Sequence, residues 1–68
     1  MRKIIATPRQ ADVLNALCEL GQTDLVSTKL KITHKTVEAH ILNCMNKNGH
    51  PNRLTLALAW DRQQRSKI

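Results

Sequence analysis

Apolar residues recur at helical spacing in four separate segments of the chain. The first segment carries four of them: Val13, Leu14, Leu17 and Leu20. Ahead of them, Thr7 and Gln10 have the identities and spacing of a capping box, and Pro8 suits the first helical position. Gly21 suits the left-handed conformation in which many helices end. We therefore expect a helix over residues 8–20.

The second segment is shorter and places Val26 and Leu30 on one face of a helix. Thr23 is the expected capping residue, because its hydroxyl can accept a hydrogen bond from a free N–H of the first turn. Asp24 follows where the helix dipole favours a negative charge. These signals predict a helix over residues 24–30.

The third segment has a narrow apolar stripe on an otherwise polar helix. The members of the stripe are Val37, Ile41 and Met45, with Cys44 beside them. Thr33 can cap the start of this helix, and Gly49 and Pro51 can end it. The expected range is 34–46, so a short turn separates this helix from the one before it.

The fourth segment follows Asn52, a capping residue, and predicts a helix over 53–65 that is apolar on two sides. One side holds Leu54, Ala57 and Leu58, and the other holds Leu56, Ala59 and Trp60. Such a helix needs two burial partners, and a second copy of the chain can be one of them. The expected dimer interface consists of Leu56, Ala59, Trp60 and Gln63. In a domain this small a tryptophan is more often a core residue, so a position in the core is the alternative for Trp60.

No segment predicts a strand, because the chain has no Phe or Tyr and no sustained alternation of apolar and polar residues. We expect a single all-α domain over residues 1–68. Its second and third helices match the helix-turn-helix pattern, in which the second helix of the pair enters the DNA major groove. The helix over 34–46 is then the recognition helix, and the helix over 53–65 is the dimerisation helix.

The distribution of charge along the chain indicates what kind of partner it binds. The chain has 68 residues and a formal net charge of +6. Between residues 27 and 60 five cations stand against Glu38 alone, whereas the first 26 residues are balanced. A small chain this basic most often meets a polyanion, usually nucleic acid. It has no room for both a catalytic cleft and a scaffold, so we expect no enzyme activity and no cofactor.

A turn of 100° per residue predicts which side chains of the third helix face away from its apolar stripe. They are Lys35, Ala39, Leu42, Asn43 and Asn46. Lys35 and Asn43 suit base edges, and Ala39 suits a thymine methyl group. Thr33 and Thr36 suit a phosphate oxygen at the start of the helix.

These residues resemble the LuxR/FixJ-type helix-turn-helix domain over about Ala6 to Trp60. The segments that carry the resemblance are Thr7-Pro8-Arg9 followed by Val13-Leu14, Lys35-Thr36-Val37 with His40, and then Asn43, Lys47, Gly49 and Asn52-Arg53. The resemblance implies a four-helix domain, dimerisation through the fourth helix and sequence-specific control of transcription. Most relatives append this domain to a receiver or ligand-sensing domain, so the chain resembles a stand-alone small member.

Some residues depart from the family pattern. The resemblance places the base-reading positions at Glu38, Ala39 and Leu42, and relatives commonly carry basic or polar residues at the first and third. Glu38 can accept a hydrogen bond from cytosine, and Leu42 can meet a thymine methyl group or another protein. Further departures lie at Leu20, Leu25 and Lys31. The full set of expected DNA-binding residues is Thr23, Thr33, His34, Lys35, Thr36, Glu38, Ala39, His40, Leu42, Asn43, Lys47 and Arg53.

The cysteines and histidines suggest no other chemistry. Cys18 and Cys44 stand far apart among apolar residues, so we expect both to be reduced and buried in a cytoplasmic protein. Cys44 follows His40 at metal-ligand spacing, but no second pair of the zinc type accompanies them, so no metal is expected. The start of the chain lacks the apolar region of a signal peptide, and no apolar run reaches membrane-spanning length.

The expected function is therefore a dimeric transcription regulator that binds double-stranded DNA. The alternative is a protein-interaction module that pairs with a larger LuxR-type regulator, or contacts RNA polymerase, and inhibits or redirects it. Non-specific packaging of nucleic acid is a third function to weigh. The near absence of aromatic residues argues against stacking on single strands or RNA.

Overall fold

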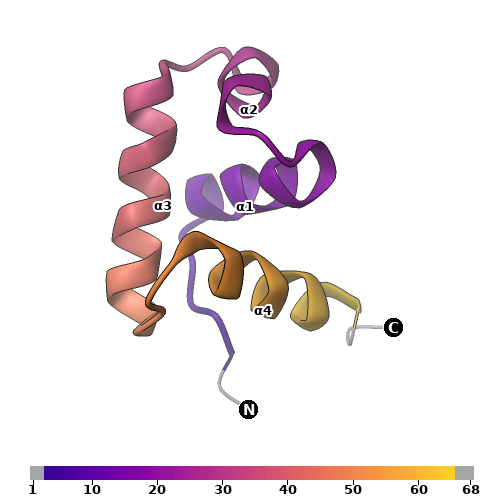
Figure 1. Ribbon diagram of the computed structural model, residues 1–68, viewed down its shortest axis with the longest axis vertical. Helices are drawn as coiled ribbons and strands as arrows, with labels where there is room; N and C mark the ends of the chain where they lie inside the picture. Colours follow the sequence, from indigo (N-terminus) through magenta and orange to yellow (C-terminus); the bar gives the residue numbers. More distant parts are fainter. Residues whose placement is uncertain (1–2, 66–68) are drawn as a thin grey trace.

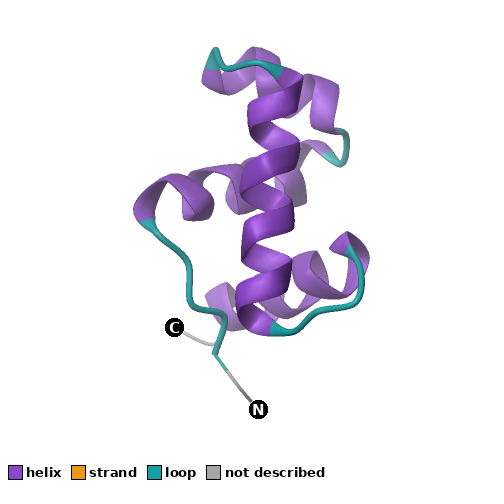
Figure 2. Cartoon of the chain, turned by 90° about the vertical axis from the view of Figure 1, so that its left-hand side faces the viewer, coloured by secondary structure: helices purple, strands orange, loops and turns teal. Residues whose placement is uncertain are grey.

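The computed structural model describes residues 3–65, and within that range the chain forms four helices and no strand. They are α1 (Pro8–Leu20), α2 (Thr23–Leu30), α3 (His34–Asn48) and α4 (Arg53–Arg65). The all-α fold predicted from the sequence is confirmed. α3 runs along one side of the molecule with the other helices beside it (Figure 1), and it lies in front when that side is viewed (Figure 2).

α1 covers the range expected for the first helix, and its ends have the expected chemistry. The Thr7 hydroxyl accepts a hydrogen bond from the Gln10 N–H at 3.2 Å, and the Gln10 side chain accepts one from the Thr7 N–H at 3.0 Å. This reciprocal pair is the predicted capping box. Gly21 has a left-handed backbone (φ 77°), and its N–H donates to the Leu17 carbonyl.

The start of α2 corrects the sequence prediction. Thr23 is the first residue of the helix rather than its cap, and Gln22 takes the cap position without a side-chain hydrogen bond. The Thr23 hydroxyl instead lies 2.7 Å from Nε2 of His34 on α3. The Thr23 hydroxyl therefore contacts a side chain of another helix in place of the expected N–H in the first turn of α2. α2 is followed by Lys31, whose φ of 57° lies in the left-handed region that favours glycine.

α3 extends past the expected end at residue 46 and continues to Asn48. Thr33 caps its start as predicted, by accepting a hydrogen bond from a first-turn N–H at 3.1 Å. At the far end the Asn48 side chain bonds both the N–H and the carbonyl of Ile5. This contact with the segment before α1 supports the last turn of α3, and Gly49 (φ 70°) then ends the helix.

The core lies between α3 and the other three helices. Its fully buried side chains are those of Val13, Leu14, Val26, Val37, Ile41, Cys44 and Leu56. The stripe predicted for the third helix therefore faces inward, with Met45 half-buried at its edge. Trp60 is only 6% exposed, and its indole N–H donates to Oδ1 of Asn15 at 2.7 Å. That bond satisfies the polar atom of a buried ring.

α4 turns toward the core the side that the sequence analysis assigned to a dimer interface. Leu56 is 0% exposed and Trp60 6%, whereas Leu54 is 66% and Leu58 52% exposed. The assignment of Leu56 and Trp60 to the interface is therefore wrong, because both already pack inside the domain. Helical periodicity could not decide between two apolar sides of one helix.

The other two residues assigned to the interface also serve the domain itself. Ala59 is half-buried against the core. The Gln63 side chain accepts a hydrogen bond from the Ile4 N–H and donates one to the Ile4 carbonyl. Since Ile4 is buried, Gln63 fixes the segment before α1 against α4.

The prediction that both cysteines are buried is half wrong. Both are free thiols, but Cys44 is buried and Cys18 is exposed on α1. The Cys18 Sγ lies 3.5 Å from the Ala57 carbonyl oxygen. Partial burial, with a smaller effect from Asp61, raises the pKa of the Cys18 thiol above its ordinary value.

Candidate nucleic-acid interface

The side of α3 that faces away from the core is open along its length. Its exposed side chains are those of Lys35, Ala39, Leu42, Asn43 and Asn46. Leu42 keeps 52% of its surface exposed, so this large apolar side chain lies in solvent, as the helical spacing predicts. α3 is therefore free on one side to enter a groove of another molecule.

The turn before α3 brings two hydroxyl groups to the same surface. Thr33 precedes the helix and Thr36 lies in its first turn, and their Oγ1 atoms are 2.8 Å apart. The Thr36 N–H already donates to Thr33, so that particular N–H is occupied. Both threonines remain exposed, and their hydroxyl groups can reach a phosphate oxygen.

Ion pairs within the domain leave the lysines around α3 uncompensated. Each acid in the described residues has a basic side chain of the same chain as its partner: Asp12 with Arg9, Glu19 with Lys29, Asp24 with the imidazole of His34, Glu38 with Arg53, and Asp61 with Arg65. Within residues 3–65, no carboxylate forms an ion pair with Lys31, Lys35 or Lys47. These lysines lie before, near the start of and near the end of α3. Its outward surface therefore carries a net positive charge.

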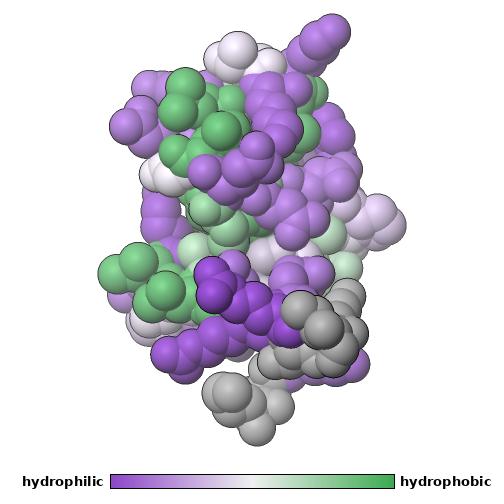
Figure 3. All heavy atoms as spheres, turned by 90° about the vertical axis from the view of Figure 1, so that its right-hand side faces the viewer, coloured by the Kyte–Doolittle hydropathy of each residue, from purple (hydrophilic) through white to green (hydrophobic). Residues whose placement is uncertain are grey.

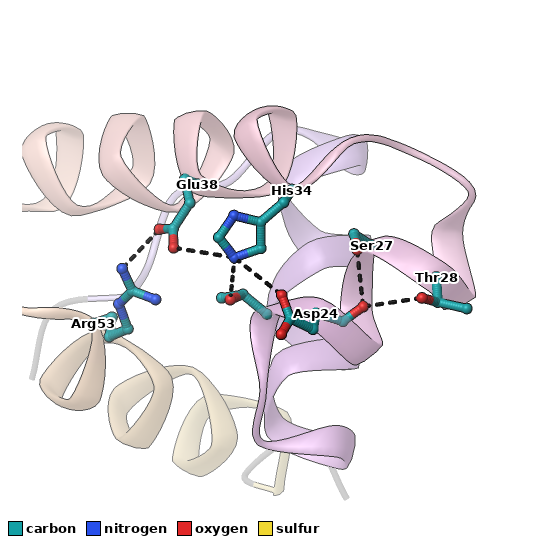
Figure 4. A network of polar contacts seen from close by, with 7 residues as sticks. Asp24, Ser27, Thr28, His34, Glu38 and Arg53 are labelled. Carbon is teal, nitrogen blue, oxygen red and sulfur yellow. Dashed lines mark hydrogen bonds and ion pairs between the residues drawn. The ribbon is translucent and has the colours of Figure 1, made fainter.

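One flank of α3 is tied to the starts of α2 and α4 by a chain of polar contacts (Figure 4). Nε2 of His34 lies 2.7 Å from the Thr23 hydroxyl, 3.5 Å from Asp24 and 3.7 Å from Glu38. The other oxygen of Glu38 lies 2.7 Å from a guanidinium nitrogen of Arg53. On this flank Arg53 and the His34 imidazole are therefore both engaged by acids of the same chain.

The opposite flank of α3 has a different composition. By helical spacing it carries Thr36, His40 and Lys47. Of these, His40 is half-buried and the other two are exposed. No acid shares this flank on α3, because Glu38 is the only acid of that helix. A polyanion therefore meets donors that hold no acid on one flank and donors already bound to acids on the other.

A short turn joins α2 to an α3 whose open face is cationic, which is the arrangement of a helix-turn-helix unit. The family model of bacterial regulatory proteins of the LuxR family, GerE, matches residues 5–59. The chain belongs to the LuxR family. The resemblance stated from its residues is confirmed, and the chain carries a helix-turn-helix domain of a family of DNA-binding regulators. No match was found among curated proteins or among solved structures.

In this LuxR-family domain the expected DNA-binding residues gather around α3. Nine of them belong to α3 itself, and Thr33 caps it. Thr23 and Arg53, which come from the starts of α2 and α4, reach the flank of α3 that carries His34 and Glu38. Sequence reasoning missed Asp24 as a member of that cluster, because its closeness to His34 depends on how α2 packs against α3.

Sequence reasoning also missed an apolar groove between α1 and α4 of the LuxR-family domain. It has a volume of about 460 Å³, and its apolar lining includes Leu17, Cys18, Gly21, Leu54, Ala57 and Leu58. On the face turned away from α3, Figure 3 shows apolar surface at the level of α4. The available signal was the Leu54–Ala57–Leu58 side of the fourth helix, which the sequence analysis recognised as apolar but turned toward the core.

No group of three or more His, Cys, Asp or Glu side chains between residues 3 and 65 is placed to hold a metal ion. Cys44, which with His40 forms the pair at metal-ligand spacing, is buried, and its Sγ accepts a hydrogen bond from the Asn48 side chain. None of the described helices has the length and apolar character needed to span a bilayer.

Proposed function

We propose that this chain is a sequence-specific transcription regulator that binds double-stranded DNA with α3 in the major groove. The observation that carries the proposal is the outward side of α3, which is open to solvent, with Lys35 on its face and Lys47 on its flank. Neither lysine has an ion-pair partner in the described residues. A groove between two phosphate backbones is the surface that such a helix fits by shape and by charge. The membership of the LuxR family supports the same function.

The side chains of α3 divide by what they can contact. Asn43 and Lys35 project from the open face and have the donors and acceptors that read base edges. Ala39 and Leu42 offer methyl groups to a thymine. Thr36, His40 and Lys47 on one flank suit one phosphate backbone, and the starts of α2 and α4, with Thr23 and Arg53, suit the other. These roles follow from position on the helix and side-chain chemistry.

The regulator is proposed to act as a twofold dimer through the exposed side of α4. Leu54 and Leu58, at 66% and 52% exposed, are two large apolar side chains on successive turns. They border the groove between α1 and α4, which a second copy can fill. A dimer of this kind reads two half-sites separated by about one turn of the double helix.

The experiment that tests DNA binding selects bound duplexes from a random pool and then measures their affinity as a function of salt. We expect a recurring sequence with twofold symmetry and a fall of log K with log[salt] of about 0.9 for each phosphate contacted. Retention of no duplex above background, even at low salt, would overturn the proposal. Enrichment without any common sequence would leave only the non-specific packaging function.

A protein-interaction module is the second candidate function, and the exposed leucines of α4 favour it as much as they favour self-pairing. The same apolar side could pair with α4 of a larger LuxR-type regulator. Mixing the chain with such a regulator and its operator separates the two functions. Loss of the regulator from its operator, by a chain that binds no duplex itself, supports the module over the DNA-binding regulator.

A further inference from the structure

Glu38 is the only acid on α3, and in the free protein both of its carboxylate oxygens face cationic or polar groups of the same chain (Figure 4). Oε2 accepts a hydrogen bond from Nη2 of Arg53 at 2.7 Å, a short, charge-assisted contact. Oε1 lies 3.7 Å from Nε2 of His34. The Glu38 side chain is 35% exposed and that of Arg53 49%, so solvent and DNA can both reach the pair.

Arg53 sits where a cation is otherwise disfavoured. It is the first residue of α4, at the positive end of the helix dipole. An acid or a phosphate placed there is stabilised by both the guanidinium and the helix terminus. In the free protein Glu38 supplies that negative charge from a residue fifteen positions earlier in the sequence. A DNA phosphate would contact the same guanidinium, so the carboxylate and the phosphate compete for it.

We propose that Glu38 is an internal competitor of the DNA backbone, which withholds Arg53 from phosphate and so lowers the affinity of the domain for duplexes in general. This inference rests on the proposed DNA-binding function. Breaking the Glu38–Arg53 pair leaves a carboxylate beside the polyanion, which is costly unless a base offers it a donor. The amino group of cytosine is such a donor in the major groove. Glu38 therefore weakens binding to most sequences more than to sites that place a cytosine opposite it.

The two flanks of α3 then have different tasks. Thr36 and Lys47 can contact phosphate on any sequence, because neither holds a carboxylate in the described residues. Arg53 contributes a phosphate contact only when Glu38 has found another partner. Sequence discrimination gains weight over non-specific attraction, because the phosphate contact of Arg53 depends on the base that Glu38 meets.

The test compares Glu38→Gln with Glu19→Gln as a matched control. Both substitutions remove one negative charge and keep the size of the side chain, and both break an exposed ion pair. The Glu19 carboxylate binds Lys29 at 2.9 Å, on α1 and α2 away from the open face of α3. The difference between the two variants therefore reports the position of the charge rather than the net charge. Circular dichroism and thermal melting show that each variant is folded.

On a random-sequence duplex we expect Glu38→Gln to bind about three- to tenfold more tightly than the wild type, and Glu19→Gln to exceed it less than twofold. The salt slope of Glu38→Gln should be steeper by about 0.9, because Arg53 now neutralises one phosphate. Arg53→Ala should lower the affinity by a larger factor in the Glu38→Gln protein, where Arg53 is free to contact phosphate, than in the wild-type protein. Preference for the selected site over random DNA should fall.

Each other outcome overturns the inference. Equal gains for Glu38→Gln and Glu19→Gln reduce the effect to net charge. Weaker binding by Glu38→Gln would mean that Glu38 helps Arg53 to bind DNA and does not compete with the phosphate for it. Equal costs of Arg53→Ala in the wild-type and Glu38→Gln proteins would mean that the two residues are not coupled. Failure of the proposed function itself looks different, because the wild type and every variant then leave all duplexes unbound at low salt.

Discussion

Single residues on the surface of α3 differ in whether their loss affects every DNA sequence or only some. Lys47 lies on the flank and ends in a point charge, which can meet phosphate but carries little sequence information. Asn43 lies on the open face with one donor group and one acceptor, a pair that matches the edge of adenine. Both side chains are exposed, so neither contributes much to the fold.

This difference gives a prediction for two substitutions. Lys47→Ala should weaken binding to selected and random duplexes by the same factor and reduce the salt slope by about one. Asn43→Ala should cost about 1–3 kcal/mol on the selected site and much less on random DNA. Fluorescence anisotropy with both duplexes at several salt concentrations measures all four effects. The division of roles is wrong if the two variants lose affinity in the same proportion on both duplexes.

The buried thiol of Cys44 gives a prediction about pH. Burial raises its pKa above the ordinary 9.0, although the Asn48 hydrogen bond and the Lys47 charge act in the opposite direction. The pKa of this thiol is therefore higher in the folded protein than in the unfolded chain. At a pH below the unfolded pKa the thiol is protonated in both states, and the buried neutral side chain contributes its full stabilisation. The stabilisation it provides is lost as pH rises from there through the folded value.

Urea unfolding of the wild type and of Cys44→Ala at pH 7 and near pH 10 checks this. The alanine variant should be less stable at neutral pH because it leaves a cavity. The gap between the two proteins should narrow as pH rises, since only the wild type loses stability through the thiol. A gap that stays constant over this range contradicts the assigned direction of the pKa shift.

At the scale of the element, α2 lacks a favourable residue at both of its ends. Its cap position lacks a side-chain hydrogen bond, and Lys31 after its last residue has a φ of 57°. A side chain in that conformation costs about 1–2 kcal/mol relative to glycine, part of which is offset by the greater entropy of glycine in the unfolded chain.

Lys31→Gly should therefore stabilise the domain by about 0.5–1 kcal/mol, equivalent to a rise in Tm of about 2–8 °C. Lys31→Ala is the matched control, because it removes the same charge but keeps the Cβ atom that causes the strain. Thermal unfolding followed by circular dichroism distinguishes them. Equal Tm changes in the two variants would assign the effect to charge and refute the role of backbone strain.

The helix ends also show which features a sequence can predict. Thr7 and Gln10 act on each other across three residues, so their identities are enough to predict the cap. Thr23 has the same local signal, but its hydroxyl is taken by His34, eleven residues away, which only the packing of α2 against α3 brings near. The Glu38–Arg53 pair was beyond prediction for the same reason, although both residues were expected at the DNA surface.

On the scale of the whole molecule, the sequence predicted four helices but not which side of α4 is buried. Leu56 with Trp60 and Leu54 with Leu58 are nearly equal in apolar character, so the helix itself holds no preference. Tertiary packing decides, since Trp60 finds a partner for its indole N–H in Asn15 on α1. The expectation of a dimer helix survives as a proposal, with its contacting residues exchanged for those on the opposite side.

That exchange makes the proposed dimer testable without unfolding the monomer. Leu54 and Leu58 keep most of their surface in solvent, so replacing both with Ser should leave the melting temperature almost unchanged. In a dimer each leucine would bury apolar surface worth about 1 kcal/mol, counted once in each copy. The double variant should therefore be monomeric by sedimentation and bind a duplex with two half-sites at least tenfold more weakly than the wild type, with no loss on a single half-site.

Leu25→Ser removes a leucine of similar exposure (46%) from α2 and should change neither the oligomeric state nor the affinity for DNA. A Leu54→Ser, Leu58→Ser protein that still sediments as a dimer would place the contact between copies elsewhere on the molecule.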